Sequence, residues 1–270
     1  LGDRAVAVGM NALANQNFTS SVDSYNVAVG YQAGFQVTTG VQNTIIGGLA
    51  GDSLTSGGSN VAVGYNALST EDGHGSNTAI GASALSVQNA GANAFNTAVG
   101  ASAGLAVTTG VQNTLIGGLA GDASTTGNEN TAIGYGSLSA STTASNNVAV
   151  GATALLTNTT GAENTAIGRR ALFSSATASN NTAVGSNALL SNTTGTRNAA
   201  LGTYSLDANT TADDNTGVGY AALSDNTTGA SNTAFGSEAL LFNTTASNNT
   251  AVGSDALRVN TTGIQNVSVG

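Results

Sequence analysis

The side chains of this sequence that could support chemistry are few. The single His, His74, lies in Glu71-Asp72-Gly73-His74-Gly75, the densest polar segment of the chain. A zinc site would normally combine such residues with a second His or a Cys, and the sequence contains neither. We therefore interpret His74 as part of an exposed turn, and we predict no metal site and no cofactor.

The other carboxylates also lack the arrangement that catalysis or calcium binding needs. Asp52 and Asp122 share one position of a repeat, and Asp213 and Asp214 occupy another, but neither position is acidic throughout. A calcium-binding β-roll would place Asp in every repeat, and glycoside hydrolysis would need one defined pair of acids. The sequence therefore favours a protein that is not an enzyme. A polysaccharide-degrading enzyme on the same scaffold stays as an alternative.

Composition narrows the class of protein further. The 270 residues carry a net charge of −9, and all five basic residues are Arg, so nucleic-acid binding is not expected. No run of about 18 apolar residues is present, and we expect no membrane insertion. The chain opens with no visible leader, and both ends lie inside the repeat pattern. Because exposed solenoid ends need caps, we expect residues 1–270 to be one continuous repeat domain within a longer fibre.

One motif organises the chain. Asn-x-x-x-Gly recurs about every 17 residues, and 13 of the 15 intervals between its glycines are 17 residues long; the others are 21 and 19. A period held this strictly indicates one structural unit stacked on copies of itself. The motif glycines, each preceded by the motif Asn from Gly30 onward, are Gly9, Gly30, Gly47, Gly64, Gly81, Gly100, Gly117, Gly134, Gly151, Gly168, Gly185, Gly202, Gly219, Gly236, Gly253 and Gly270.

The repeat predicts a parallel β-solenoid of about 16 coils. Thr-Ala-Val before each Gly is typical of a short strand, and we expect the Leu four residues after Gly to belong to a second strand. A Thr-Thr-Gly or Thr-Thr-Ala turn follows, and these two turns alternate from residue 142 to give a 34-residue double repeat. No 3.6-residue apolar stripe survives between the Gly and Asn residues, so a helical fold is excluded.

Strand alternation assigns the side chains of each repeat to two faces. Thr and Val share one face, which we expect to form the core, and Asn, Ala and Gly share the other. The small-residue face would then suit packing against other chains. We read the Asn column as structural, through turns or stacked amides, with a polar ligand array as the alternative; representative pairs are Asn43 with Gly47, Asn164 with Gly168, and Asn232 with Gly236.

The runs Asn26–Gly30, Asn77–Gly81 and Asn181–Gly185 resemble the head repeats of trimeric autotransporter adhesins, and they look equally like repeat arrays of bacteriophage tail fibres. This resemblance covers nearly the whole chain. It implies a left-handed β-roll, a homotrimeric rod with the small-residue strands at its axis, and an extracellular place on a cell or virion surface. The period here is longer than in the adhesins, and no stalk or anchor is visible.

Aromatic residues are the candidates for binding a host glycan or receptor. Tyr occurs just after the motif Gly in four coils, where it either packs at a corner or points outward. The two long coils predict loops at residues 14–25 and 86–95, and such insertions often carry the binding face. The candidate surface-binding residues are Tyr31, Tyr65, Tyr135, Tyr220, Phe18, Tyr25 and Phe95.

Two further patterns accompany the repeat. Asn-Thr-Thr recurs six times from Asn158 to Asn260 and matches the glycosylation sequon, although the repeat explains it as a turn. Residues 27–64 and 97–134 are near-copies that use Gly where Leu is usual, so we expect thinner sections there.

The favoured function is a structural fibre or adhesin segment that presents a trimeric rod for attachment to a host cell or surface. The alternative is an ice-binding solenoid, because Thr lies three residues before the motif Gly in ten coils. That Thr column is interrupted in five coils and shares its face with the Val that we expect to be buried.

Overall fold

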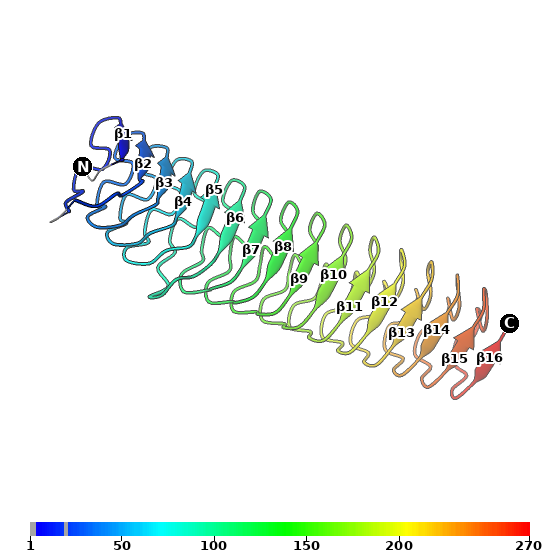
Figure 1. Cartoon of the computed structure of the whole chain (residues 1–270). Coiled ribbons are helices and arrows are strands. Elements are labelled where there is room, and N and C mark those ends of the chain that lie inside the picture. Colours follow the sequence, from blue (N-terminus) through cyan, green and yellow to red (C-terminus); the bar gives the residue numbers. More distant parts are fainter. Residues whose placement is uncertain (1–3, 19–20) are drawn as a thin grey trace. The chain divides into compact units, whose positions relative to one another are not determined.

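The computed structural model describes residues 4–18 and 21–270, which form short strands joined by turns (Figure 1). Contacts group the chain into an N-terminal unit, Leu1–Tyr135, and a C-terminal unit, Gly136–Gly270. Each unit holds eight strands of three residues, and each is a parallel β-solenoid with a 17-residue coil. The predicted all-β fold and its repeat are confirmed.

The strands fall where the Thr-Ala-Val pattern predicts them. Those of the N-terminal unit are β1 (Val6–Val8), β2 (Val27–Val29), β3 (Thr44–Ile46), β4 (Val61–Val63), β5 (Thr78–Ile80), β6 (Thr97–Val99), β7 (Thr114–Ile116) and β8 (Thr131–Ile133). Those of the C-terminal unit are β9 (Val148–Val150), β10 (Thr165–Ile167), β11 (Thr182–Val184), β12 (Ala199–Leu201), β13 (Thr216–Val218), β14 (Thr233–Phe235), β15 (Thr250–Val252) and β16 (Val267–Val269).

Neighbouring strands within each unit pair in parallel, with equivalent residues side by side. Thr165 of β10 pairs with Thr182 of β11. The register also holds across the two long intervals, since Val6 pairs with Val27 and Thr78 pairs with Thr97. The extra residues therefore leave the coils as loops, as their spacing predicts.

The interior of each coil is built from the strand's middle residue and a turn. In β10 the middle residue, Ala166, is fully buried, and so are Ala171 and Leu172 of the turn that follows. The motif Asn164 is also buried. Ala, Leu and Asn therefore face inward together, which is the reverse of the expected arrangement.

The expected second strand is wrong. The segment that contains Leu172 is a turn, and both Arg170 and Leu172 have left-handed backbones with φ of 57° and 50°. Consecutive residues of a strand point to opposite sides, whereas here Ala171 and Leu172 both point inward. The turn still bonds coil to coil, because Leu172 N–H donates to Ala188 O at 3.0 Å.

In the Gly-rich coils a large strand residue lies beside the glycines. Gly104 and Gly121 stand where Leu is usual, in the left-handed backbone that this position always adopts. Leu115 replaces the small middle residue of β7, and its side chain fills the space beside both glycines. Ile45 of β3 does the same in the other near-copy. One large strand residue therefore stands beside two glycines and fills space that turn Leu residues fill in the other coils.

The motif Asn forms the amide ladder that stacking in register predicts. In the C-terminal unit, Asn181 Oδ1 accepts the backbone N–H of Asn198 at 3.0 Å, and Asn181 Nδ2 donates to Gly195 O at 2.9 Å. Asn43 and Asn232 occupy equivalent positions and are fully buried. The structural interpretation of this column is confirmed, because its amides are paired inside the coil and are closed to an external ligand.

The 34-residue double repeat also has a hydrogen-bond basis. In alternate coils, the residue after Thr-Thr-Ala or Ala-Thr-Ala accepts a backbone N–H from the preceding coil. Ser179 Oγ accepts from Ala162 N–H, and Ser247 Oγ accepts from Ala230 N–H, both at 3.0 Å. Donor coils and acceptor coils therefore alternate in the C-terminal unit.

Candidate interaction surface

The outward face of the strands is made by Thr and by large aliphatic residues. The first and third residues of each strand point away from the interior, because the middle residue points into it. In β10, Ile167 is 40% exposed while Ala166 is fully buried. The expectation that the Val face forms the core is therefore wrong. The interior beside the inward Leu admits mainly Ala and Asn, so the large residues of the third strand position lie outside. Ile45 and Leu115 enter the interior where Gly replaces that Leu.

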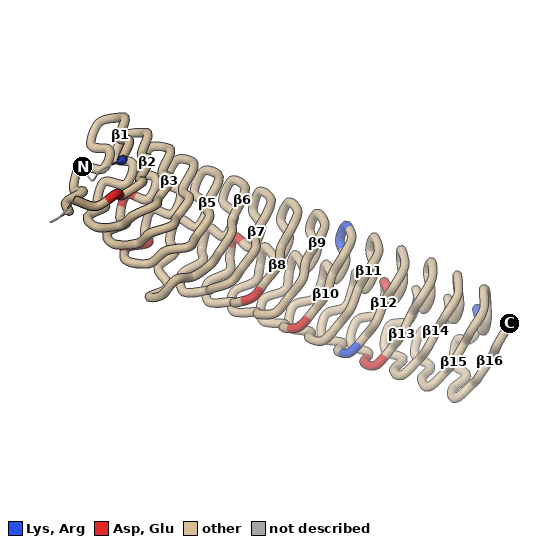
Figure 2. Tube along the Cα trace, viewed as in Figure 1, with Lys and Arg blue, Asp and Glu red and all other residues tan. Residues whose placement is uncertain are grey.

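The third strand positions form a column of exposed apolar side chains in each unit. In the N-terminal unit these are 36–39% exposed at Val29, Ile46, Ile80, Ile116 and Ile133. In the C-terminal unit they are 36–57% exposed at Ile167, Val184, Leu201, Phe235 and Val252. We call this face, with the Thr residues two positions earlier, the Thr–aliphatic face. Among the described residues, every charged one lies outside the strands (Figure 2), so the strand positions of this face are uncharged.

The four predicted Tyr residues lie at the edge of the Thr–aliphatic face and are 48–63% exposed: Tyr31, Tyr65, Tyr135 and Tyr220. Two of them also pack at the coil corner. The Tyr65 ring lies 3.7 Å from where a Cβ on Gly48 would be, and Tyr135 lies at the same distance from the equivalent point on Gly118. Corner packing therefore holds for Tyr65 and Tyr135, and all four rings keep an outward surface; contact with a glycan or receptor stays a prediction.

The aromatic residues of the two loops differ in their surroundings. Phe95 is 58% exposed, and Phe18 is half-buried. Tyr25 is 47% exposed and stacks under the Arg4 guanidinium, whose carbon lies 5.5 Å from the ring centre. Arg4 also pairs with Asp23 at 2.9 Å. Residues 19–20 of the first loop lie outside the described residues.

The sequon asparagines form a second buried column. Asn192, Asn209, Asn226 and Asn243 are fully buried. Each Nδ2 bonds a nearby turn carbonyl, as Asn209 does with Ala212 O at 3.1 Å, and Asn209 also donates to Asn192 Oδ1 at 2.9 Å. The turn interpretation is confirmed, and these amides are closed to glycan attachment in the folded chain.

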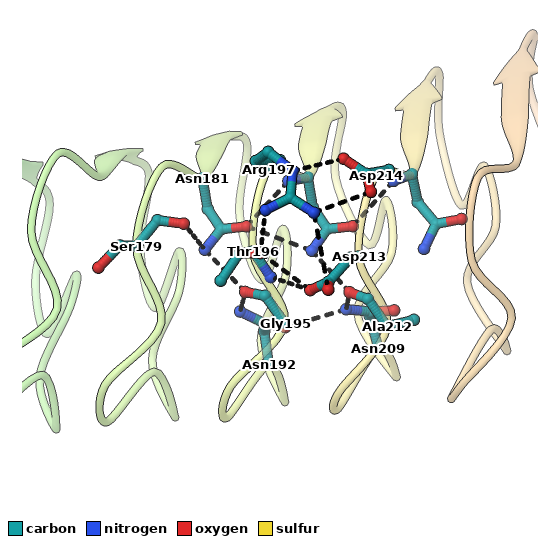
Figure 3. Close-up of polar contacts among 12 residues, drawn as sticks. Ser179, Asn181, Asn192, Gly195, Thr196, Arg197, Asn209, Ala212, Asp213 and Asp214 are labelled. Carbon is teal, nitrogen blue, oxygen red and sulfur yellow. Dashed lines mark hydrogen bonds and ion pairs between the residues drawn. The ribbon is translucent and has the colours of Figure 1, made fainter.

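An exposed ion pair braces two coils of the C-terminal unit (Figure 3). Arg197 Nε and Nη2 donate to the two Asp214 carboxylate oxygens at 2.7 and 2.9 Å. This hydrogen bonding raises the pKa of Arg197 and lowers that of Asp214. Asp213 accepts the backbone N–H of Thr196 at 2.6 Å. Arg197 thus pairs with acids of the next coil, which indicates a brace between coils.

The buried amide ladder contributes more to stability than this brace does. Asn181→Ala leaves Asn198 N–H without its partner and takes one of two donors from Gly195 O, which keeps Asn192 Nδ2. An unpaired buried group costs roughly 1–3 kcal/mol, and each further lost hydrogen bond costs about 0.5–1.5 kcal/mol. We expect a loss of about 2–5 kcal/mol in the free energy of unfolding. Arg197→Gln is the matched surface control and should change it much less, because exposed ion pairs add little. Urea unfolding followed by circular dichroism measures both, and equal losses would contradict the ladder's role.

The polar cluster around His74 is more enclosed than an exposed turn. Glu71 is fully buried, and the His74 side chain is 31% exposed. Glu71, Asp72 and His74 bring three possible metal ligands within 4.8 Å of one another, and no other such group occurs in the part of the chain that the structure describes.

Of the other acids singled out from the sequence, Asp52 is half-buried, and desolvation raises its pKa.

No pocket opens in the region described by the structure, and no helix there is long and apolar enough to cross a membrane. No protein-family model matches the chain, and no curated protein is significantly similar to it. Fold and surface therefore define the class: a parallel β-solenoid repeat protein with an exposed apolar strand face.

Proposed function

We propose that this chain is a segment of a fibre in which copies of it associate through the Thr–aliphatic face. The observation that carries the proposal is the column of partly to largely exposed apolar side chains at the third strand position of each unit. Contiguous exposed apolar surface of this kind marks protein interaction sites. The column lacks charge along its length, so an apolar partner surface suits it.

A second copy of the chain fits this face better than an unrelated protein does. Equivalent side chains recur at each coil, with neighbouring strands about 4.8 Å apart. An identical chain therefore has the same spacing, and symmetric association repeats one contact at every coil. The number of copies, three, and the left-handed coil come from the resemblance to adhesin and tail-fibre repeats. The sequence led us to expect the Ala–Asn face at the axis of the assembly. We place the Thr–aliphatic face there instead, because the Ala–Asn face is buried inside each coil.

The proposed role of the fibre is attachment to a host cell or other surface, from outside a cell or on a virion. The outward aromatic residues and the loops at residues 14–25 and 86–95 would contact a glycan or receptor. Deleting these loops should abolish binding to a glycan array or to host cells, while a chain with Tyr65→Ala and Tyr135→Ala tests the aromatic column. Full binding by both variants would argue against attachment through these features.

Ice binding is the second candidate, and the structure provides an observation that favours it. The Thr column lies on the outward face, with Thr182 and Thr233 exposed, which removes our reason for placing it inside the core. A regular lattice of Thr hydroxyls and methyl groups could order water along the face. Thermal hysteresis of a dilute solution tests this role. Its absence would rule out ice binding and leave the fibre as the remaining candidate.

A further inference from the structure

Glu71 occupies an interior position that other coils fill with neutral side chains. The position recurs through the N-terminal unit, and its occupants there are Gln16, Val37, Leu54, Glu71, Gln88, Val107 and Ser124. The Glu71 side chain is fully buried, and it is the single buried ionisable residue among those described. A carboxylate that is removed from water needs a cation or several donors to offset the loss of hydration.

The groups around Glu71 offer few hydrogen-bond donors. The His74 backbone N–H donates to Oε1 at 3.2 Å, and Gln88 Nε2 approaches Oε2 at 3.4 Å. The arginine ion pairs in the described part of the chain involve other acids. Burial raises the pKa of Glu71, against the opposing effect of the His74 hydrogen bond and charge.

His74 directs a ring nitrogen at this carboxylate without forming a hydrogen bond. Its Nδ1 is shut off from solvent and has no hydrogen-bond partner. The same atom lies 3.3 Å from Glu71 Oε1 and 3.9 Å from Asp72 Oδ1. One nitrogen and two carboxylate oxygens therefore converge on one point from a four-residue segment.

We propose that Glu71, Asp72 and His74 form a zinc-binding site. Zinc takes nitrogen at about 2.0–2.1 Å and carboxylate oxygen at about 2.0–2.2 Å in a tetrahedron, so its ligand atoms lie roughly 3.3–3.5 Å apart. The contact between His74 Nδ1 and Glu71 Oε1 already has this separation, and a small rotation of Asp72 completes the set. Water supplies the fourth ligand through the exposed edge of the His74 ring.

The site would tie the turn at residues 71–74 to its neighbours. Gln88 reaches Glu71 from the next coil, and Asn93 Oδ1 accepts the Gly75 N–H at 2.9 Å. Both residues belong to the inserted loop at 86–95. The bound ion would therefore order the coil that supports this loop. This inference is independent of the proposed fibre, because its ligands all come from one chain.

Calorimetric titration of chelator-treated protein with zinc chloride tests the site. We expect one zinc ion per chain, and Co²⁺ should give the absorption bands of four-coordinate metal. Glu71→Gln keeps the shape of the side chain, and Gln88 shows that the column accepts Gln. It should weaken zinc binding at least about tenfold, since even outer-shell changes cost 10–100-fold. His74→Ala should do the same, whereas Glu163→Gln, at an exposed acid, should not.

An absence of zinc uptake by the unaltered chain, or unchanged affinity in folded Glu71→Gln and His74→Ala chains, would overturn the proposal. If Glu71→Gln fails to fold by circular dichroism, Asp72→Asn replaces it, since Asp72 is 55% exposed. Unchanged affinity of that variant together with His74→Ala would then overturn the site.

Discussion

Gly117→Ala will destabilise the chain strongly, whereas Gly118→Ala, one residue further on, will be tolerated. Gly117 is a motif glycine with φ of 130°, a backbone that L-residues rarely adopt. A Cβ there would lie 2.6 Å from Gly134 O of the next coil. The methyl group therefore meets backbone strain and a carbonyl that cannot move without breaking the stack.

Gly118 provides the matched control within the same turn. A Cβ on Gly118 would meet nothing closer than Tyr135 Cδ2 at 3.7 Å, which is ordinary contact. We expect Gly117→Ala to cost more than about 3 kcal/mol, combining strain of roughly 1–3 kcal/mol with the clash. Gly118→Ala should stay within about 1 kcal/mol of the parent. Urea midpoints together with hydrogen exchange at β7 and β8 measure the difference, and equal midpoints would refute the close-stacking explanation.

Two acidic substitutions on the Thr–aliphatic face should abolish self-association without unfolding the chain. Ile167→Glu with Leu201→Glu places charges where the parent side chains are 40% and 42% exposed. These side chains lie outside the core, so each separate chain should keep its fold. Carboxylates brought together between copies would be desolvated and would repel one another.

The control for these variants moves the same charges to the turns. Thr160→Glu with Thr194→Glu adds two acids at exposed turn positions of the same unit. This chain should keep the parent mass, while the strand-face variant should fall to one chain with an unchanged circular dichroism spectrum. Loss of association in both variants would mean that net charge, and not the face, controls assembly.

The coil period, the strand positions, the loops and the Asn ladder were all predictable from the sequence, because each depends on spacing in register. Residues such as Asn181 and Thr182 recur at intervals that only stacking explains. The direction of the faces was not predictable from alternation alone. Alternation separates Ala166 from Ile167, but it cannot decide which of them points inward.

The conformation of the turn after each strand decides which strand face points inward. Ala171 and Leu172 are consecutive and apolar, a pattern that a strand would place on opposite sides. Leu in a left-handed backbone is uncommon, so propensity favoured a strand at this position. The fact that Gly34 and Gly104 replace Leu in the near-copies was the available signal, since Gly favours this backbone. The burial of Glu71 was not predictable from the sequence either. The equivalent interior positions of the other coils can be identified only after the coils are aligned through their turns.

The mass of the unaltered chain in dilute solution tests the central claim most directly. Light scattering after size exclusion should give three times the 26.1 kDa of one chain, because the Thr–aliphatic faces of the copies would be buried together. A folded monomer at all concentrations, with that face open to water, would contradict the fibre proposal.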